Sequence, residues 1–133
     1  MSIQKTVTFT TGNWDESTYR ELAGEQKMNR TEMSRSCSGD FEGVSTVEYL
    51  LFYDNPGRSR FVGLERFEGS VDGRSGSFVV ELTGYFENGK VEEKGTILQG
   101  FGTGDLRDLY GETTLSTGEA GAYQVQYTYG FAE

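Results

Sequence analysis

The sequence contains no histidine, and only one cysteine and one proline, in 133 residues. Without histidine, the chain lacks the commonest general base and the commonest zinc ligand, which excludes every Ser-His-Asp or Cys-His mechanism. The single cysteine, Cys37, excludes an internal disulfide and a cysteine metal cluster. Carboxylates alone favour only weak binding of hard ions, so we expect no metal site and no cofactor.

Positive charge is also scarce, because 12 Lys and Arg face 21 Asp and Glu, giving a net charge of −9. Nucleic acids and anionic membranes are bound through basic faces, so we expect neither as a partner. The first residues, MSIQKTVTFTTG, lack the apolar core of a signal peptide, and no apolar run approaches the length of a membrane span. These features favour a cytoplasmic protein.

Glycine, by contrast, is abundant. The 19 glycines are spread along the chain and mark no linker, so we expect one domain over residues 1–133. They separate short runs rich in Val, Thr, Tyr and Phe, which is typical of an all-β domain. Hairpin turns are predicted at Pro56-Gly57, Asp72-Gly73 and Asn88-Gly89, with a looser turn at Gly118 to Gly121.

The turns divide the chain into about eight strands. These are expected near residues 4–11, 27–38, 43–54, 59–71, 74–87, 90–100, 111–117 and 122–132. Residues 14–24 are expected to form a loop or a short helix. About eight antiparallel strands in meander order predict a single closed antiparallel β-barrel, because closure leaves no unpaired edge.

Two-residue turns fix the register of the strands that they join. On that register Phe67 lies opposite Phe78, and Glu48 lies opposite Glu65. We expect one continuous apolar face to form the barrel interior, with Phe86 and Val91 on it. The same face carries the residues that we expect to line a site for a small apolar molecule: Leu50, Phe52, Phe61, Phe67, Phe78, Val80, Leu82 and Ile97.

The opposite face of the same strands is mostly polar but also carries Val62, Leu64, Val79 and Leu98. Apolar patches of this kind usually mark contacts with another chain. We therefore expect a homo-oligomer, with a dimer favoured.

Two carboxylates, Glu48 and Glu65, are the candidate catalytic groups. Side by side in an apolar interior, they repel each other and lose hydration, which raises the pKa of at least one and makes the pair titrate as a unit. One could then act as a general acid and the other as a base. Arg35 would lie diagonally from Glu48 and keep it ionised, leaving Glu65 protonated. Alternatively, the three groups form a polar cluster that fixes strand register. Glu93, on the same face, is expected in water at a barrel mouth.

Seven segments of the chain, in this order, resemble a known family. They are GNWDE (12–16), SGDFEG (38–43), EYL (48–50), FVGLERFEG (61–69), GRSGSFV (73–79), TGYFENG (83–89) and GTGDLRDLYGE (102–112). Together they look like the small bacterial proteins grouped as domain of unknown function number 3224, and the resemblance spans nearly the whole chain.

That family is similar in fold to the allene oxide cyclase and dirigent barrels, and GTGDLRDLYGETTL also resembles a turn of allene oxide cyclases. The resemblance implies a closed antiparallel barrel with a central apolar cavity, and it implies no assigned activity. Where relatives tend to read Gln-His-Thr-Gly, this chain reads Glu81-Leu82-Thr83-Gly84. Any family chemistry that uses an interior imidazole is therefore absent from this chain.

Three functions remain open from the sequence. The first is a cofactor-independent isomerase or cyclase that folds a small apolar substrate inside the barrel, with Glu48 or Glu65 donating or polarising. The second is a non-catalytic binding protein for a small hydrophobic molecule, with the carboxylates anchoring its polar end. The third is a barrel filled by its own side chains, whose function lies in its oligomer surfaces.

Overall fold

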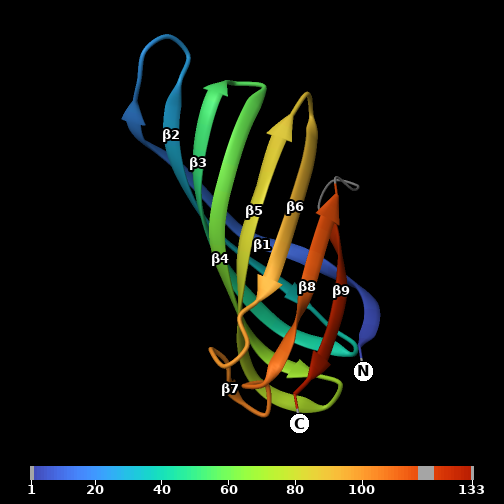
Figure 1. Ribbon diagram of the computed structural model, residues 1–133. Coiled ribbons are helices and arrows are strands. Elements are labelled where there is room, and N and C mark those ends of the chain that lie inside the picture. Colours follow the sequence, from blue (N-terminus) through green and yellow to red (C-terminus); the bar gives the residue numbers. More distant parts are fainter. Residues whose placement is uncertain (1, 117–121, 133) are drawn as a thin grey trace.

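The computed structural model describes residues 2–116 and 122–132, and the described residues form nine strands (Figure 1). They are β1 (Ile3–Glu21), β2 (Lys27–Cys37), β3 (Phe41–Asn55), β4 (Arg58–Val71), β5 (Arg74–Glu87), β6 (Lys90–Ile97), β7 (Thr103–Gly104), β8 (Leu109–Ser116) and β9 (Ala122–Phe131). Nothing in these ranges forms a helix with the length and hydropathy needed to cross a bilayer.

Eight of these strands form a closed antiparallel ring, as the sequence predicted. The ring runs β4-β3-β2-β1-β9-β8-β6-β5, and the pairing of β4 with β5 closes it. The short β7 lies outside the ring, where it pairs with Gly76 and Ser77 of β5. Figure 1 shows the hairpin turns of β1–β2, β3–β4 and β5–β6 at the upper end of the barrel and both chain termini towards the lower end.

Two of the predicted hairpins have the predicted register. Asp72 and Asn88 have positive φ angles of 51° and 54°, and each is followed by a glycine with positive φ. Positive φ at both central residues defines the turn whose twist matches that of the flanking strands. Phe67 therefore lies opposite Phe78, as calculated from two-residue turns.

The third hairpin turns at Pro56-Gly57 as predicted, but its register shifts by one residue. Asn55 pairs with Arg58, and the next pair is Tyr53 with Ser59, so Asp54 forms a bulge. Proline holds φ near −65° and cannot provide the positive φ that a primed turn needs at its first central residue. A bulge next to the turn is one way to join such a turn to twisted strands.

The bulge reverses the two faces of β3, so the predicted interior positions on this strand are wrong. Glu48, Leu50 and Phe52 lie on the outer face, with Leu50 49% exposed and Phe52 38% exposed. Because side chains alternate along a strand, one extra residue exchanges every inward and outward position beyond it. The inward side chains of β3 are instead Val47, Tyr49, Leu51 and Tyr53.

The expectation of a loop or short helix at residues 14–24 is also wrong. β1 continues through Glu21 and pairs with β2 along this segment, with Trp14 opposite Met33 and Glu16 opposite Thr31. A register shift between Thr11 and Trp14 brings Trp14 and Glu16 to the inner face. The predicted looser turn at Gly118 to Gly121 falls outside the described residues.

Aromatic side chains fill the barrel at the end that holds the termini. Phe67 and Phe78 stack with ring centroids 4.8 Å apart. The ring centroid of Phe41 lies 4.6 Å from that of Tyr127 and 5.3 Å from that of Tyr129. All five side chains are at most 1% exposed. Burial of large rings with offset and edge contacts is a strong source of stability for a small domain. This half of the barrel is therefore a packed core.

Candidate functional site

The other half of the barrel, near the β3–β4 and β5–β6 turns, is hollow. It contains a cavity of about 280 Å³. The side chains that line it come from seven of the eight ring strands and are mostly aromatic or aliphatic: Trp14, Glu16, Met33, Arg35, Tyr49, Leu51, Tyr53, Ser59, Phe61, Phe86, Val91, Glu93 and Leu115. An apolar cavity with a few convergent polar groups is the usual form of a small-molecule site.

A buried ion pair lies at the inner end of this cavity. Arg35 on β2 donates two hydrogen bonds to Glu65 on β4, from Nη2 to Oε1 at 2.6 Å and from Nε to Oε2 at 3.2 Å. The two side chains are 2% and 1% exposed. Burial alone would lower the pKa of Arg35, but its electrostatic interactions with Glu65, Tyr49 and Glu93 outweigh burial and hold that pKa above its usual range. Arg35 is therefore a permanent buried cation.

A second carboxyl group, Glu93 on β6, shares this end of the cavity. Its Oε2 lies 4.0 Å from Nη2 of Arg35, and its Oε1 accepts a hydrogen bond of 2.5 Å from the hydroxyl of Tyr49. Burial raises the pKa of Glu93, although Arg35 and the Tyr49 hydroxyl oppose this shift. The expectation that Glu93 lies in water is wrong, because the side chain is 4% exposed. The reversed face of β3, which brings Tyr49 inward, contributes to this enclosure.

The outer part of the cavity contains a third carboxylate. Oε2 of Glu16 on β1 accepts hydrogen bonds from Nδ2 of Asn29 at 2.6 Å and from the hydroxyl of Tyr53 at 2.9 Å. Burial is the larger cause and the hydrogen bond to Glu16 the smaller one, and together they raise the pKa of Tyr53 to about 12. Trp14, the only tryptophan in the sequence, lines the cavity nearby and is 52% exposed. The partial exposure of these side chains places the cavity mouth at this end.

One polar atom in the cavity lining is left without a partner. Ser59 on β4 is 2% exposed, and its Oγ has no hydrogen-bond partner among the described residues. Buried hydroxyl groups are normally hydrogen-bonded, because leaving one unpaired costs free energy. The Ser59 hydroxyl in the cavity wall is therefore able to form a hydrogen bond with a polar atom of a ligand.

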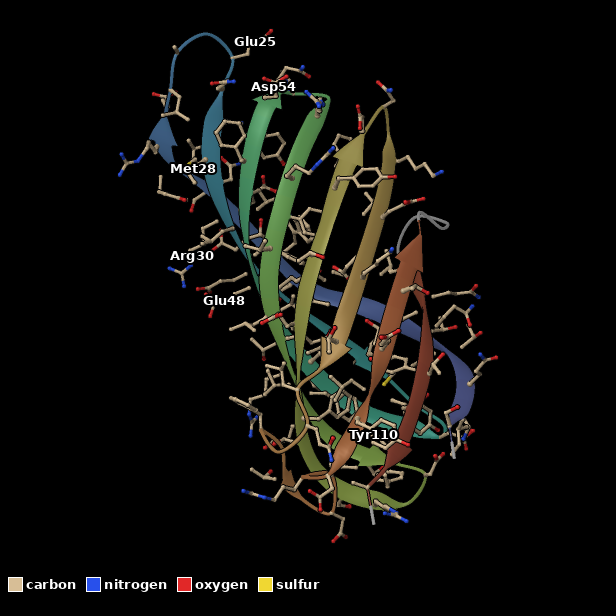
Figure 2. The ribbon with its side chains drawn as sticks, in the orientation of Figure 1. Glu25, Met28, Arg30, Glu48, Asp54 and Tyr110 are labelled. Atoms are coloured by element: carbon tan, nitrogen blue, oxygen red, sulfur yellow. The ribbon has the colours of Figure 1, made fainter. Side chains whose placement is uncertain are left out.

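The sequence-predicted catalytic residues are only partly brought together. Glu65 and Arg35 are in contact, but Glu48 forms an ion pair of 2.6 Å with Arg30 on the outside of the barrel. Figure 2 shows Arg30 and Glu48 side by side on the outer surface. The predicted sharing of a proton by Glu48 and Glu65 is therefore wrong, since their strand faces are opposite.

The predicted ligand-lining residues divide into three groups. Phe61 lines the cavity, whereas Leu50 and Phe52 lie outside the barrel. The other predicted lining residues are buried in the barrel without lining this cavity: Phe67, Phe78, Val80, Leu82 and Ile97. Sequence reasoning missed Tyr49, whose inward position depends on the bulge at Asp54. The signal that could have found it is Pro56, which is incompatible with a primed turn.

The outer surface carries the apolar patch expected from the sequence and extends it to β3. Val62 and Leu64 are 53% and 55% exposed, while Val79 and Leu98 are half-buried. Leu50 of β3 is exposed directly opposite Val62. No group of three or more Cys, Asp or Glu in residues 2–116 and 122–132 is arranged to hold a metal ion.

The fold and the cavity define a small closed β-barrel with an apolar chamber that ends in a buried Arg-Glu-Glu cluster. The chain belongs to the family described as "Protein of unknown function (DUF3224)", whose profile matches residues 5–129. The resemblance found in the sequence segments is therefore confirmed. No functionally curated protein matches the chain.

A solved structure has the same fold over the whole chain. It is the crystal structure of a protein with unknown function from the DUF3224 family of Shewanella oneidensis MR-1, with a TM-score of 0.85 and 23% sequence identity. The alignment covers 100% of this chain and 99% of that chain. At this identity the likeness shows a shared fold.

Proposed function

We propose that this protein binds a small, largely apolar molecule in the cavity, with a polar group of that molecule held at the buried end of the cavity by Glu93. The observation that carries the proposal is the contrast between the two halves of the barrel. One half is filled with aromatic rings, while the other encloses about 280 Å³ and contains charged side chains. Burying charge is costly, and a structural core gains little from it.

The single tryptophan gives a direct test of binding. Trp14 lines the cavity, so a ligand that enters changes the fluorescence of the one indole in the chain. Titration with small aromatic and aliphatic molecules is expected to give saturable changes. Filling the cavity with Ser59→Phe is expected to abolish them, and Leu115→Phe is a second blocking variant. Saturable changes that persist unaltered in folded samples of both variants would contradict the proposal.

A cofactor-independent isomerisation or cyclisation in the same cavity is the second candidate. The observation that favours it is the raised pKa of Glu93, caused by burial, next to a permanent cation. Protonated Glu93 can donate its proton to a bound substrate, and its carboxylate can then remove a proton from a neighbouring atom of that substrate. Arg35 would stabilise negative charge that develops on a substrate oxygen.

The residues assigned to this reaction differ from the sequence-based assignment. Glu93 takes the role predicted for Glu48 and Glu65, since Glu48 is outside and Glu65 is fully engaged by Arg35. With an identified substrate, Glu93→Gln is expected to abolish turnover even at saturating substrate, because the amide cannot exchange a proton. Glu48→Gln is the matched control and is expected to leave turnover unchanged. Unchanged turnover in Glu93→Gln would exclude this mechanism.

A further inference from the structure

The charges around the cavity are unequal in number. Among the described residues that line it, Arg35 is the one cation, whereas Glu16 and Glu93 are both acidic. The positive charge of Arg35 is already met by two hydrogen bonds to Glu65 behind the lining. Its guanidinium carbon also lies 4.9 Å from the ring centroid of Phe9. The surplus charge that a ligand would meet in the cavity is therefore negative.

The aromatic part of the wall favours the same sign of ligand charge. Faces of aromatic rings carry a negative quadrupole and attract cations, most strongly when the cation is desolvated. The rings that line the cavity are Trp14, Tyr49, Tyr53, Phe61 and Phe86. One of these rings already has a cation–π contact with a lysine outside the lining, because Nζ of Lys27 lies 5.2 Å from the ring centroid of Tyr53.

Two polar groups in the wall can accept hydrogen bonds from a ligand. Among the described residues, Glu93 accepts one side-chain hydrogen bond, which the Tyr49 hydroxyl donates to Oε1. The other oxygen, Oε2, lies 4.0 Å from Nη2 of Arg35. Ser59 Oγ has no partner there. An ammonium group has three N–H donors and could reach more than one acceptor, with the bond to a carboxylate being charge-assisted.

We propose that the ligand of this cavity is a small amine, positively charged at neutral pH, with its ammonium group at Glu93 and its apolar body against the aromatic rings. The inference rests on the ligand-binding function proposed above and gives that ligand a chemical class. The cavity has room for about nine water molecules at ~30 Å³ each, so the ligand has a comparable number of non-hydrogen atoms. An anion would instead approach two carboxylates while the one lining cation is already paired.

Three probes of similar size and different charge test the inference. They are 2-phenylethylamine as the cation, propylbenzene as the neutral molecule and 3-phenylpropanoate as the anion, each titrated against Trp14 fluorescence at neutral pH. We expect the cation to bind about tenfold or more tighter than either of the others, because a charge-assisted bond in a desolvated site is added. Tighter binding of the neutral or anionic probe would overturn the inference and leave the ligand-binding proposal standing. If none of the three binds, both are overturned.

Substitutions then locate the charge that selects the cation. Glu93→Gln is expected to bring the affinities for the cation and the neutral probe within about threefold of each other, since it removes the carboxylate but keeps the shape. Glu16→Gln is the matched control and is expected to have the smaller effect, because Glu16 is already bonded to Asn29 and Tyr53. An equal loss in both variants, or a larger loss in Glu16→Gln, would overturn the assignment to Glu93.

Proton release gives a readout that a purely structural role of Glu93 would not produce. The titratable and charged groups near Glu93 are Arg35 from β2, Tyr49 from β3, Glu65 from β4 and Tyr127 from β9. Its cross-strand neighbours on β5 and β8 are uncharged. Because burial raises the pKa of Glu93, a pH just above the ordinary glutamate pKa leaves part of this side chain protonated, and an arriving ammonium displaces that proton. Calorimetry in two buffers of different ionisation enthalpy should therefore give different heats for the cation in wild type and equal heats in Glu93→Gln. Equal heats in wild type would contradict the proposed contact.

Discussion

Arg35 and Glu65 are joined by two hydrogen bonds although their strands, β2 and β4, are not neighbours. β3 lies between them, and its residues Ser45 and Val47 pair with Arg35 and Glu65 respectively. The curvature of the barrel brings the two long side chains together over the inner face of β3. Both charges are buried, so the pair is stable only while both partners are present.

The first prediction concerns the removal of one partner of this pair. Arg35→Met leaves Glu65 and Glu93 buried without a cation, and we expect it to lower the free energy of unfolding by about 3–5 kcal/mol. The double variant Arg35→Met/Glu65→Met replaces the pair with apolar side chains and is expected to recover most of that loss. Urea unfolding of the wild type and both variants measures the difference. A double variant less stable than Arg35→Met would contradict this account.

The second prediction is a dependence of stability on pH that Glu93 causes. Burial raises the pKa of Glu93 in the folded chain above its ordinary value of 4.5. The folded state then binds more protons than the unfolded state, so the stabilisation is fully present below the ordinary pKa and is lost as pH rises through the folded pKa. The slope reaches at most about 1.4 kcal/mol per pH unit.

Glu93→Gln isolates this contribution from that of the surface carboxylates. The melting temperature of the variant, relative to that of the wild type, is expected to increase as the pH rises above the ordinary glutamate pKa of 4.5. Glu48→Gln on the outer surface serves as control and is expected to show no such trend, because Glu48 is 54% exposed and ion-paired. If the melting temperatures of wild type and Glu93→Gln change in parallel with pH, burial does not raise the pKa of Glu93.

The third prediction uses a glycine beside the buried cluster. A Cβ atom at Gly63 would overlap the carbonyl oxygen of Glu48 and lie 2.7 Å from Cδ1 of Tyr49. Gly63→Ala is therefore expected to destabilise the protein by about 1–3 kcal/mol, as overpacking does. At Gly57 the nearest atom is Oδ1 of Asn55 at 3.4 Å, so Gly57→Ala is expected to change stability by less than about 0.5 kcal/mol. Equal effects of the two substitutions in thermal unfolding would show that crowding at Gly63 is relieved.

The fourth prediction is that this chain forms a dimer through its outer apolar patch. Val62 and Leu64 lie two residues apart on the outer face of β4 and expose more than half of their surface, and such patches on soluble proteins usually mark contacts. Leu64→Glu is expected to give a monomer in light scattering at micromolar concentration. Thr8→Glu adds the same charge to the exposed face of β1, away from the patch, and is expected to leave the dimer intact. A monomeric wild type would refute the prediction.

The fold class and most of the strand pairing follow from local sequence patterns. Glycine punctuation and short β-prone runs predicted the closed antiparallel ring, and Asp72-Gly73 and Asn88-Gly89 fixed the register of β4, β5 and β6. These features are local, because a turn sequence that requires positive φ sets the pairing of the residues next to it. For the same reason Glu65 was correctly placed in the interior.

The identity of the groups that form the site depends instead on how the strands pack in three dimensions. A single bulged residue, Asp54, moved Glu48 to the outside and Tyr49 to the inside, because each residue added to a strand exchanges its faces. The contacts of Arg35 with Glu65 and Glu93 join strands that are not sequence neighbours, so turn chemistry could not specify them. The hollow at one end depends on how all the inward side chains fill the barrel together, which is a property of three-dimensional packing and of no single segment.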